Sequence, residues 1–208
     1  MHDQTTTIEN FLEAAAAKQP TPGGGAVAAL AGSLAAAMGE MVLNYSVGKK
    51  GLEKHQQELK AALAEFHRAR MMMLELMTED QSAYEALTAA RKMPADSPKR
   101  AEAVTSGVML CVRVPQNIAG TAAAVLELTE KLVDQVNHHL LSDLAVCAEM
   151  AMATTRAALY NVRVNLAEIG DAEQRGQIEA TDRQLLQRAV GLIQKVQPRI
   201  WERVSRQG

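Results

Sequence analysis

Residues 26–43 form a run of small and apolar side chains that contains one serine and one glutamate as its clearly polar members. The run is long enough to suggest a membrane span. Alanine and glycine gain little from lipid, however, and the glutamate would be costly at depth. Glycines recur every seven residues at Gly25, Gly32 and Gly39, so they form one stripe on which another helix can approach closely. This stretch predicts the central, water-excluded helix of a soluble bundle, with the stripe as a candidate subunit interface.

The remainder of the chain also has helical periodicity, and no segment alternates as a strand would. The expected helices cover roughly residues 8–18, 26–47, 52–91, 97–136, 141–169 and 181–206. Pro115 and Pro198 fall inside two of these segments and should kink them. We therefore predict an all-α fold in which residues 1–208 form a single bundle of about six helices.

Composition excludes several classes of partner. Charges of both signs are mixed along the 208 residues, the formal net charge is −2, and 3% of the residues are aromatic. These features argue against nucleic acid or an anionic membrane as a partner. Cys111 and Cys147 stand alone, as expected of reduced cysteines in a cytoplasmic protein, and the polar N-terminal segment lacks the apolar core of a secretory signal. His138 and His139 are adjacent with no third ligand in view, so no metal site is expected.

The central helix is expected to begin at three consecutive glycines, Gly23, Gly24 and Gly25. They match neither a Walker phosphate loop nor a dinucleotide-binding loop, because no strand precedes them and no suitable lysine follows. Unpaired N–H groups at a helix start still favour an anion, either a phosphate or a carboxylate. The structural alternative is a tight turn with close backbone packing.

Polar residues also follow at the far end of the same helix, where Asn44 precedes Lys49 and Lys50. Lysines there complement the negative end of the helix dipole, which is a sufficient structural explanation. The functional alternative is a cationic rim for an anionic ligand.

Further candidates are polar side chains among apolar neighbours. Asp80 and Tyr84 lie one turn apart within a long helix. If Asp80 is buried, its pKa is raised. The structural alternative is that Asp80 is a solvated acid at the edge of the apolar face. Asp143 stands near a helix start, where capping is the structural explanation. Asn161 and Asn165 lie four residues apart on one helix face, an arrangement that could hydrogen-bond a heterocycle.

Six segments occur in the order found in a known family: PTPGGGAVAALAGSLAAAMGEMV, NYSVGKK, EDQSAYEAL, VPQNIA, LLSDLAVCAEMA and ALYNVRVNL. Together they resemble the cyclodeaminase/cyclohydrolase family, which includes the cyclodeaminase half of formiminotransferase-cyclodeaminase and stand-alone methenyltetrahydrofolate cyclohydrolases. The resemblance extends from residue 8 to about residue 206. It implies an all-α homodimer with folate sites near the subunit interface and no cofactor beyond the tetrahydrofolate substrate.

One turn departs from the family pattern. Residues 136–139 read Val-Asn-His-His, where members commonly carry Gly-Asn-x-Asn. If this turn shapes the pocket, it affects substrate choice or activity. The 208 residues leave no room for a formiminotransferase half, which favours a stand-alone cyclohydrolase.

The resemblance implies hydrolysis of 5,10-methenyltetrahydrofolate to 10-formyltetrahydrofolate. The alternatives are formiminotetrahydrofolate cyclodeaminase, which releases ammonia, and a folate-binding protein without activity. On the same resemblance, the expected catalytic residues are Asp80, Asp143 and Lys49. The expected substrate-binding residues are Gly23, Gly24, Gly25, Asn44, Lys50, Tyr84, Asn161 and Asn165.

Overall fold

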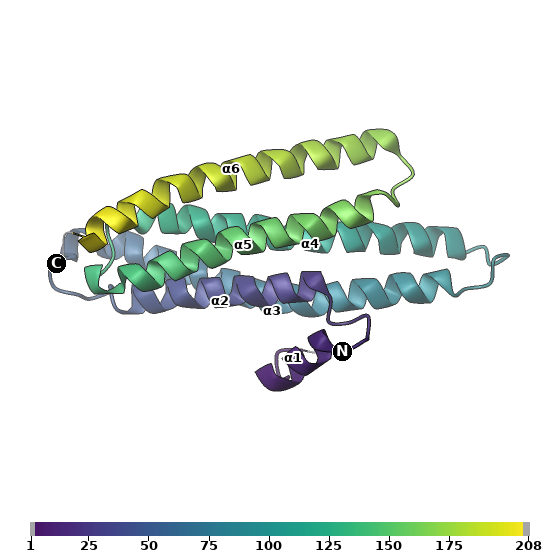
Figure 1. The fold of residues 1–208 in the computed structure, drawn as a ribbon, viewed down its shortest axis with the longest axis horizontal. Coiled ribbons are helices and arrows are strands. Elements are labelled where there is room, and N and C mark those ends of the chain that lie inside the picture. The colour runs from purple at the N-terminus through teal and green to yellow at the C-terminus, as the bar shows by residue number, and fades with distance from the viewer. Residues whose placement is uncertain (1–2, 206–208) are drawn as a thin grey trace.

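A computed structural model describes residues 3–205 and confirms the all-α prediction, because this part of the chain contains six α-helices and no strand (Figure 1). The α-helices are α1 (Ile8–Ala16), α2 (Gly24–Asn44), α3 (Gln56–Arg91), α4 (Arg100–Leu132), α5 (Leu141–Leu166) and α6 (Ala172–Ser205). Two single-turn 3-10 helices, η1 (Glu53–His55) and η2 (His138–Leu140), precede α3 and α5.

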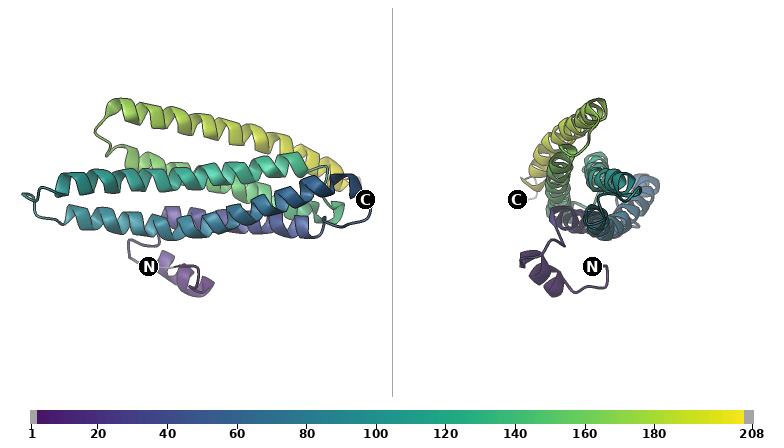
Figure 2. Two further views of the ribbon diagram at one scale, coloured as in Figure 1. Left: turned by 180° about the vertical axis from the view of Figure 1, so that it is seen from behind. Right: turned by 90° about the vertical axis from the view of Figure 1, so that its right-hand side faces the viewer.

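Helices α2 to α5 form an elongated four-helix bundle in which α2 packs on α3 and α5, and α4 packs on the same two helices. Helix α6 lies over α4 and α5, and the short α1 stands beside the bundle near the start of α2 (Figures 1 and 2). Helices α3 and α4 continue past the start of α2, so the end of the bundle that carries the α3–α4 turn is not covered by α2 (Figure 1).

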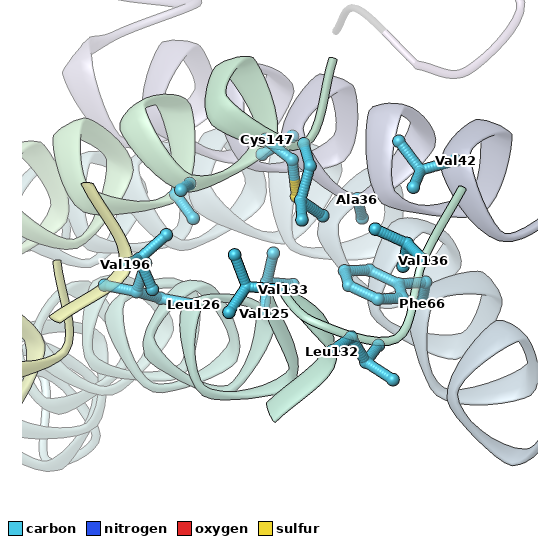
Figure 3. Packing of buried hydrophobic residues seen from close by; sticks show 14 of the residues in the cluster. Ala36, Val42, Phe66, Val125, Leu126, Leu132, Val133, Val136, Cys147 and Val196 are labelled. Atoms are coloured by element: carbon cyan, nitrogen blue, oxygen red, sulfur yellow. The ribbon is translucent and has the colours of Figure 1, made fainter. Parts of the chain in front are cut away.

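The interior is filled by aliphatic side chains and by Phe66, which is fully buried at one end of the bundle with Leu126 and Val196 (Figure 3). The glycine stripe of α2 faces this interior. A Cβ at position 39 would lie 2.3 Å from the Phe66 ring, and one at position 32 would lie 2.7 Å from Met73. The prediction that this stripe forms a subunit interface is therefore wrong, because it receives side chains of α3 from the same chain.

Helices α2 and α4 are long and apolar enough to cross a membrane by length and composition alone. In each, 56% of the apolar window is buried inside the bundle. Core packing therefore accounts for part of this apolarity.

Helix α4 runs unbroken through Pro115, and α6 runs unbroken through Pro198. Proline has no N–H, so the carbonyl of Cys111, four residues before Pro115, loses its helical donor. The side-chain amide of Asn165 on α5 replaces that donor, with Nδ2 2.8 Å from the Cys111 oxygen. This cross-helix bond satisfies the carbonyl that proline leaves open.

Helix α6 begins nine residues before its expected start at residue 181. The backbone N–H groups of Glu173 and Gln174 donate to Oδ1 of Asp171, at 2.9 and 3.2 Å. This cap starts the helix in a polar segment, where apolar periodicity gives no signal.

Candidate active site

Asp80 of α3 approaches the first turn of α2. The backbone N–H of Ala26 donates to its Oδ2 at 2.9 Å, so the carboxylate accepts from one of the donors that a helix start leaves unpaired. A Cβ at position 25 would lie 2.0 Å from Asp80 Oδ1. Glycine is therefore required at position 25 if the carboxylate is to lie against the helix backbone.

Two opposing effects act on the Asp80 carboxyl. Burial raises its pKa above the ordinary value, and the hydrogen bond from Ala26 lowers it; the effect of burial is the larger. The carboxyl is consequently a stronger base than an exposed aspartate, which suits a proton acceptor.

A cavity of about 280 Å³ opens beside Asp80, where α3, α4 and α5 extend past the start of α2. Seven of the eleven predicted site residues line it: Gly23, Gly24, Gly25, Asp80, Tyr84, Asn161 and Asn165. These seven are half of the fourteen residues that line the cavity, and their roles remain predictions.

The two asparagines use their amino groups within the fold. Asn161 Nδ2 donates to the Ala157 carbonyl at 2.9 Å, and Asn165 Nδ2 donates to the carbonyls of Asn161 and Cys111. A Cβ at position 24 would lie 2.9 Å from Asn161 Oδ1, so Gly24 also permits a close approach. Both donors of the Asn165 amino group are thus engaged, whereas Asn161 keeps one N–H, and the oxygens of both amides can accept hydrogen bonds from a ligand.

Sequence reasoning missed the other seven residues that line the cavity: Pro20, Thr21, Leu87, Arg91, Cys111, Val164 and Glu168. The sequence contained a signal for Leu87 and Arg91, because they follow Asp80 by 7 and 11 residues and therefore lie on the same face of the helix. Burial and the nearby Asp80 charge raise the pKa of Cys111, so its thiol stays protonated. Arg91 forms an ion pair with Glu168 across the cavity wall.

The other four predicted residues, Asn44, Lys49, Lys50 and Asp143, do not line this cavity. The first three lie at or beyond the end of α2, whose 21 residues span about 30 Å. Within one chain the structure therefore separates the eleven residues into a group of seven at the start of α2 and a group of four at the opposite end.

The second group is organised by Asn137. Lys49 Nζ donates to Asn137 Oδ1 at 2.6 Å, the Asn137 N–H donates to Ser46 Oγ at 2.9 Å, and Asn137 Nδ2 donates to the Tyr45 carbonyl at 3.3 Å. The turn that departs from the family pattern thus holds the first lysine in place. Asp143 lies in the first turn of α5, where no side chain caps the helix.

In the described part of the chain, no group of three His, Cys, Asp or Glu side chains is arranged to hold a metal ion. The cavity instead joins a partly buried carboxylate, a helix start and two amides on an apolar floor. These features define the protein as an all-helical one with a candidate site for a small polar molecule.

Comparison with known proteins identifies the family. The sequence profile named formiminotransferase-cyclodeaminase matches residues 7–184, and the chain belongs to this family. It is 31% identical to the methenyltetrahydrofolate cyclohydrolase of Methylorubrum extorquens over 176 residues, which cover 81% of this chain and 85% of that protein. It is 30% identical to the formimidoyltransferase-cyclodeaminase of Gallus gallus over 189 residues, which cover 89% of this chain and 35% of that protein.

The fold agrees with these relatives. A solved structure of formiminotetrahydrofolate cyclodeaminase from Thermotoga maritima superposes with a TM-score of 0.81 at 25% sequence identity, and the match covers 97% of this chain and 96% of that chain. The chain spans about a third of the length of the vertebrate formimidoyltransferase-cyclodeaminases that it matches. These comparisons confirm the resemblance inferred from the six sequence segments.

Proposed function

We propose that the protein hydrolyses 5,10-methenyltetrahydrofolate to 10-formyltetrahydrofolate. The observation that carries this proposal is the Asp80 carboxylate, partly buried against the start of α2 in a cavity with two amides. The substrate's amidinium carbon is already electrophilic, so the reaction needs a positioned proton acceptor and complementary charge. The Methylorubrum relative, which is matched over most of its length, is named for this activity.

In the proposed reaction, Asp80 accepts a proton from water as the water oxygen bonds to the amidinium carbon. A neutral tetrahedral adduct forms, and Asp80 then returns the proton to N5 as the bond between carbon and N5 breaks. The one-carbon unit remains on N10 as a formyl group when the adduct's hydroxyl releases its proton to solvent. Burial favours this role because it makes the carboxylate a stronger base.

We also propose that the protein is a homodimer, and surface composition supports this. Helix α2 with its C-cap carries an outward apolar stripe at alternating steps of three and four residues, in which Gly24, Val27, Leu34 and Tyr45 are exposed and Ala31, Met38 and Met41 are half-buried. The adjacent α5 exposes a second one: Val146, Met150, Ala153, Ala157, Tyr160 and Val164. Neither stripe contains a charge, although Tyr160 and Val164 are 69% and 75% exposed. Two neighbouring stripes with this spacing fit the same pair on a second copy.

An antiparallel pairing about the middle of α2 would place the start of each α2 beside the end of the partner's α2. The partner subunit's Asn44, Lys49, Lys50 and Asp143 would then approach the Asp80 cavity. At about 280 Å³ this cavity is slightly smaller than the roughly 300 Å³ at which small-molecule sites begin. Side chains of the partner subunit would extend the walls of this cavity and close its opening.

The reaction is tested by mixing the purified protein with 5,10-methenyltetrahydrofolate and following the loss of its near-ultraviolet absorbance. Acceleration over the buffer rate supports the proposal, and no acceleration refutes it. The cyclodeaminase alternative is supported by the Thermotoga structure and predicts ammonia release from 5-formiminotetrahydrofolate. Folate binding without either reaction would indicate an inactive binding protein.

The shared site is tested by subunit mixing. Asp80→Asn and Lys49→Gln variants should each be inactive as homodimers, whereas exchange between them creates mixed dimers with one intact site. Mixed samples should therefore regain turnover. If both residues acted within one chain, mixed dimers would contain no intact site and turnover would stay absent. A cytoplasmic location is proposed with this function, since it is where a reduced thiol such as that of Cys111 persists.

A further inference from the structure

The cavity is elongated and has different chemistry at its two ends. Asp80, Tyr84, Leu87 and Arg91 follow one face of α3, and all four line the cavity. Eleven residues of helix separate Asp80 from Arg91, which is about 16 Å. The cavity therefore runs from the partly buried carboxylate, over the apolar Leu87, to an arginine.

The arginine end lies beside a basic segment. Residues 91–100 join α3 to α4 and contain four basic residues and one acidic residue. Arg100 Nη2 donates to the Arg91 carbonyl at 3.5 Å, and the buried Nε of Arg100 has no hydrogen-bond partner among residues 3–205. The segment that joins α3 to α4 thus carries more positive than negative charge beside the cavity.

We propose that Arg91 binds the glutamate carboxylate of the folate substrate. This inference rests on the proposed function and adds to it the orientation of the substrate. Folate is elongated, and its p-aminobenzoyl unit separates the reacting one-carbon unit from the glutamate. With the reacting carbon at Asp80, the p-aminobenzoyl ring lies over Leu87 between Tyr84 and Val164, and the carboxylate reaches the guanidinium. Arginine suits this role because its planar donors match a carboxylate in a bidentate pair.

The ion pair between Arg91 and Glu168 is compatible with replacement of Glu168 by a substrate carboxylate. Glu168 pairs with Arg91, and the two side chains are 39% and 45% exposed. Ion pairs at this exposure contribute little to stability, so a substrate carboxylate can replace Glu168 at small cost. Glu168 then acts as a competitor that holds Arg91 in position while the site is empty.

The test compares ligands with and without the glutamate. Binding of 5-formyltetrahydrofolate and 5-formyltetrahydropteroate, two stable analogues, is measured by calorimetry in the wild type and in Arg91→Gln. Loss of a charge-assisted hydrogen bond should weaken binding of the glutamate-bearing ligand by roughly 10- to 100-fold. Binding of the pteroate should not change. For turnover, the KM for 5,10-methenyltetrahydrofolate should rise by a similar factor while kcat is retained.

Arg188→Gln is the matched control, because Arg188 is also an exposed arginine paired with a glutamate, on α6. It should leave both affinities unchanged. Glu168→Gln should tighten binding of the glutamate-bearing ligand severalfold, which a purely structural ion pair would not do. Equal weakening of both ligands in Arg91→Gln, or no preference for the glutamate in the wild type, would overturn the assignment. The calorimetric affinities do not depend on turnover. Failure of the proposed reaction is therefore distinguished from failure of the Arg91 assignment.

Discussion

Replacement of Gly25 by alanine probes the contact on which the site depends. The new Cβ would lie 2.0 Å from Asp80 Oδ1, whereas ordinary contacts begin at 3.4 Å, so the two atoms must separate by about 1.4 Å. Overpacking of this kind costs about 1–3 kcal/mol of unfolding free energy. The carboxylate would also leave the Ala26 N–H, and a displacement of about 1 Å at a catalytic group can lower turnover ~10²-fold.

Urea unfolding at pH 7 measures the stability change, and loss of methenyltetrahydrofolate absorbance measures turnover. Gly191→Ala in α6 is the control, because nothing lies within 4 Å of its new Cβ and alanine should stabilise the helix by about 0.5–1 kcal/mol. In an Asp80→Ala background the cost of Gly25→Ala should shrink, since the clashing atoms are those of the carboxyl group. An equal cost in both backgrounds, or full turnover in Gly25→Ala, would refute the reasoning.

Three further predictions follow from the same contacts. Asp80→Asn should lower turnover by about 10²- to 10⁴-fold. Burial raises the pKa of Asp80 in the folded protein above its value in the unfolded chain. The unfolding free energy of the wild type should therefore fall as the pH rises between these two pKa values. Urea titrations across that pH range should show no such fall for Asp80→Asn. The acid limb of the wild-type pH–rate profile should lie above the ordinary pKa of an aspartate, 3.8, since the ionised form is the base. Asn165→Leu should cost about 1–3 kcal/mol in urea unfolding, because the Cys111 carbonyl freed by Pro115 loses its donor.

The fold could be predicted from sequence because its signals are local. The helical period and the proline and glycine positions indicated six helices, and six are present in residues 3–205. The start of α6 was placed too late because the segment after Asp171 has no apolar periodicity. The Asp171 side chain nevertheless caps the helix there. Pro115 was expected to disturb α4, but the donor that compensates for it comes from α5, 50 residues away.

The candidate site was only partly predictable, because part of it depends on contacts between helices and not on local signals. Asp80 and Asn161 could be identified as polar side chains among apolar ones, and the structure brings both to the glycines of α2. Arg91 shares a helix face with Asp80, but this spacing alone does not distinguish it from a solvated helix residue, since its importance depends on the cavity that forms where α2 no longer covers α3. The glycine stripe was attributed to a second subunit, yet Phe66 and Met73 of the same chain occupy it.

The rigidity of α2 links these observations to the proposed dimer. A 21-residue helix keeps its two ends about 30 Å apart, so no side-chain movement can bring Lys49 to Asp80 within one chain. The lysine is also held by Asn137, which fixes it at the far end. If both residues serve one reaction, the second must come from another copy, and the exposed apolar stripes of α2 and α5 lie between the two ends. The inward glycines of α2 admit α3 of the same chain. In the proposed dimer, the outward apolar stripe of the same helix would pack on the partner subunit.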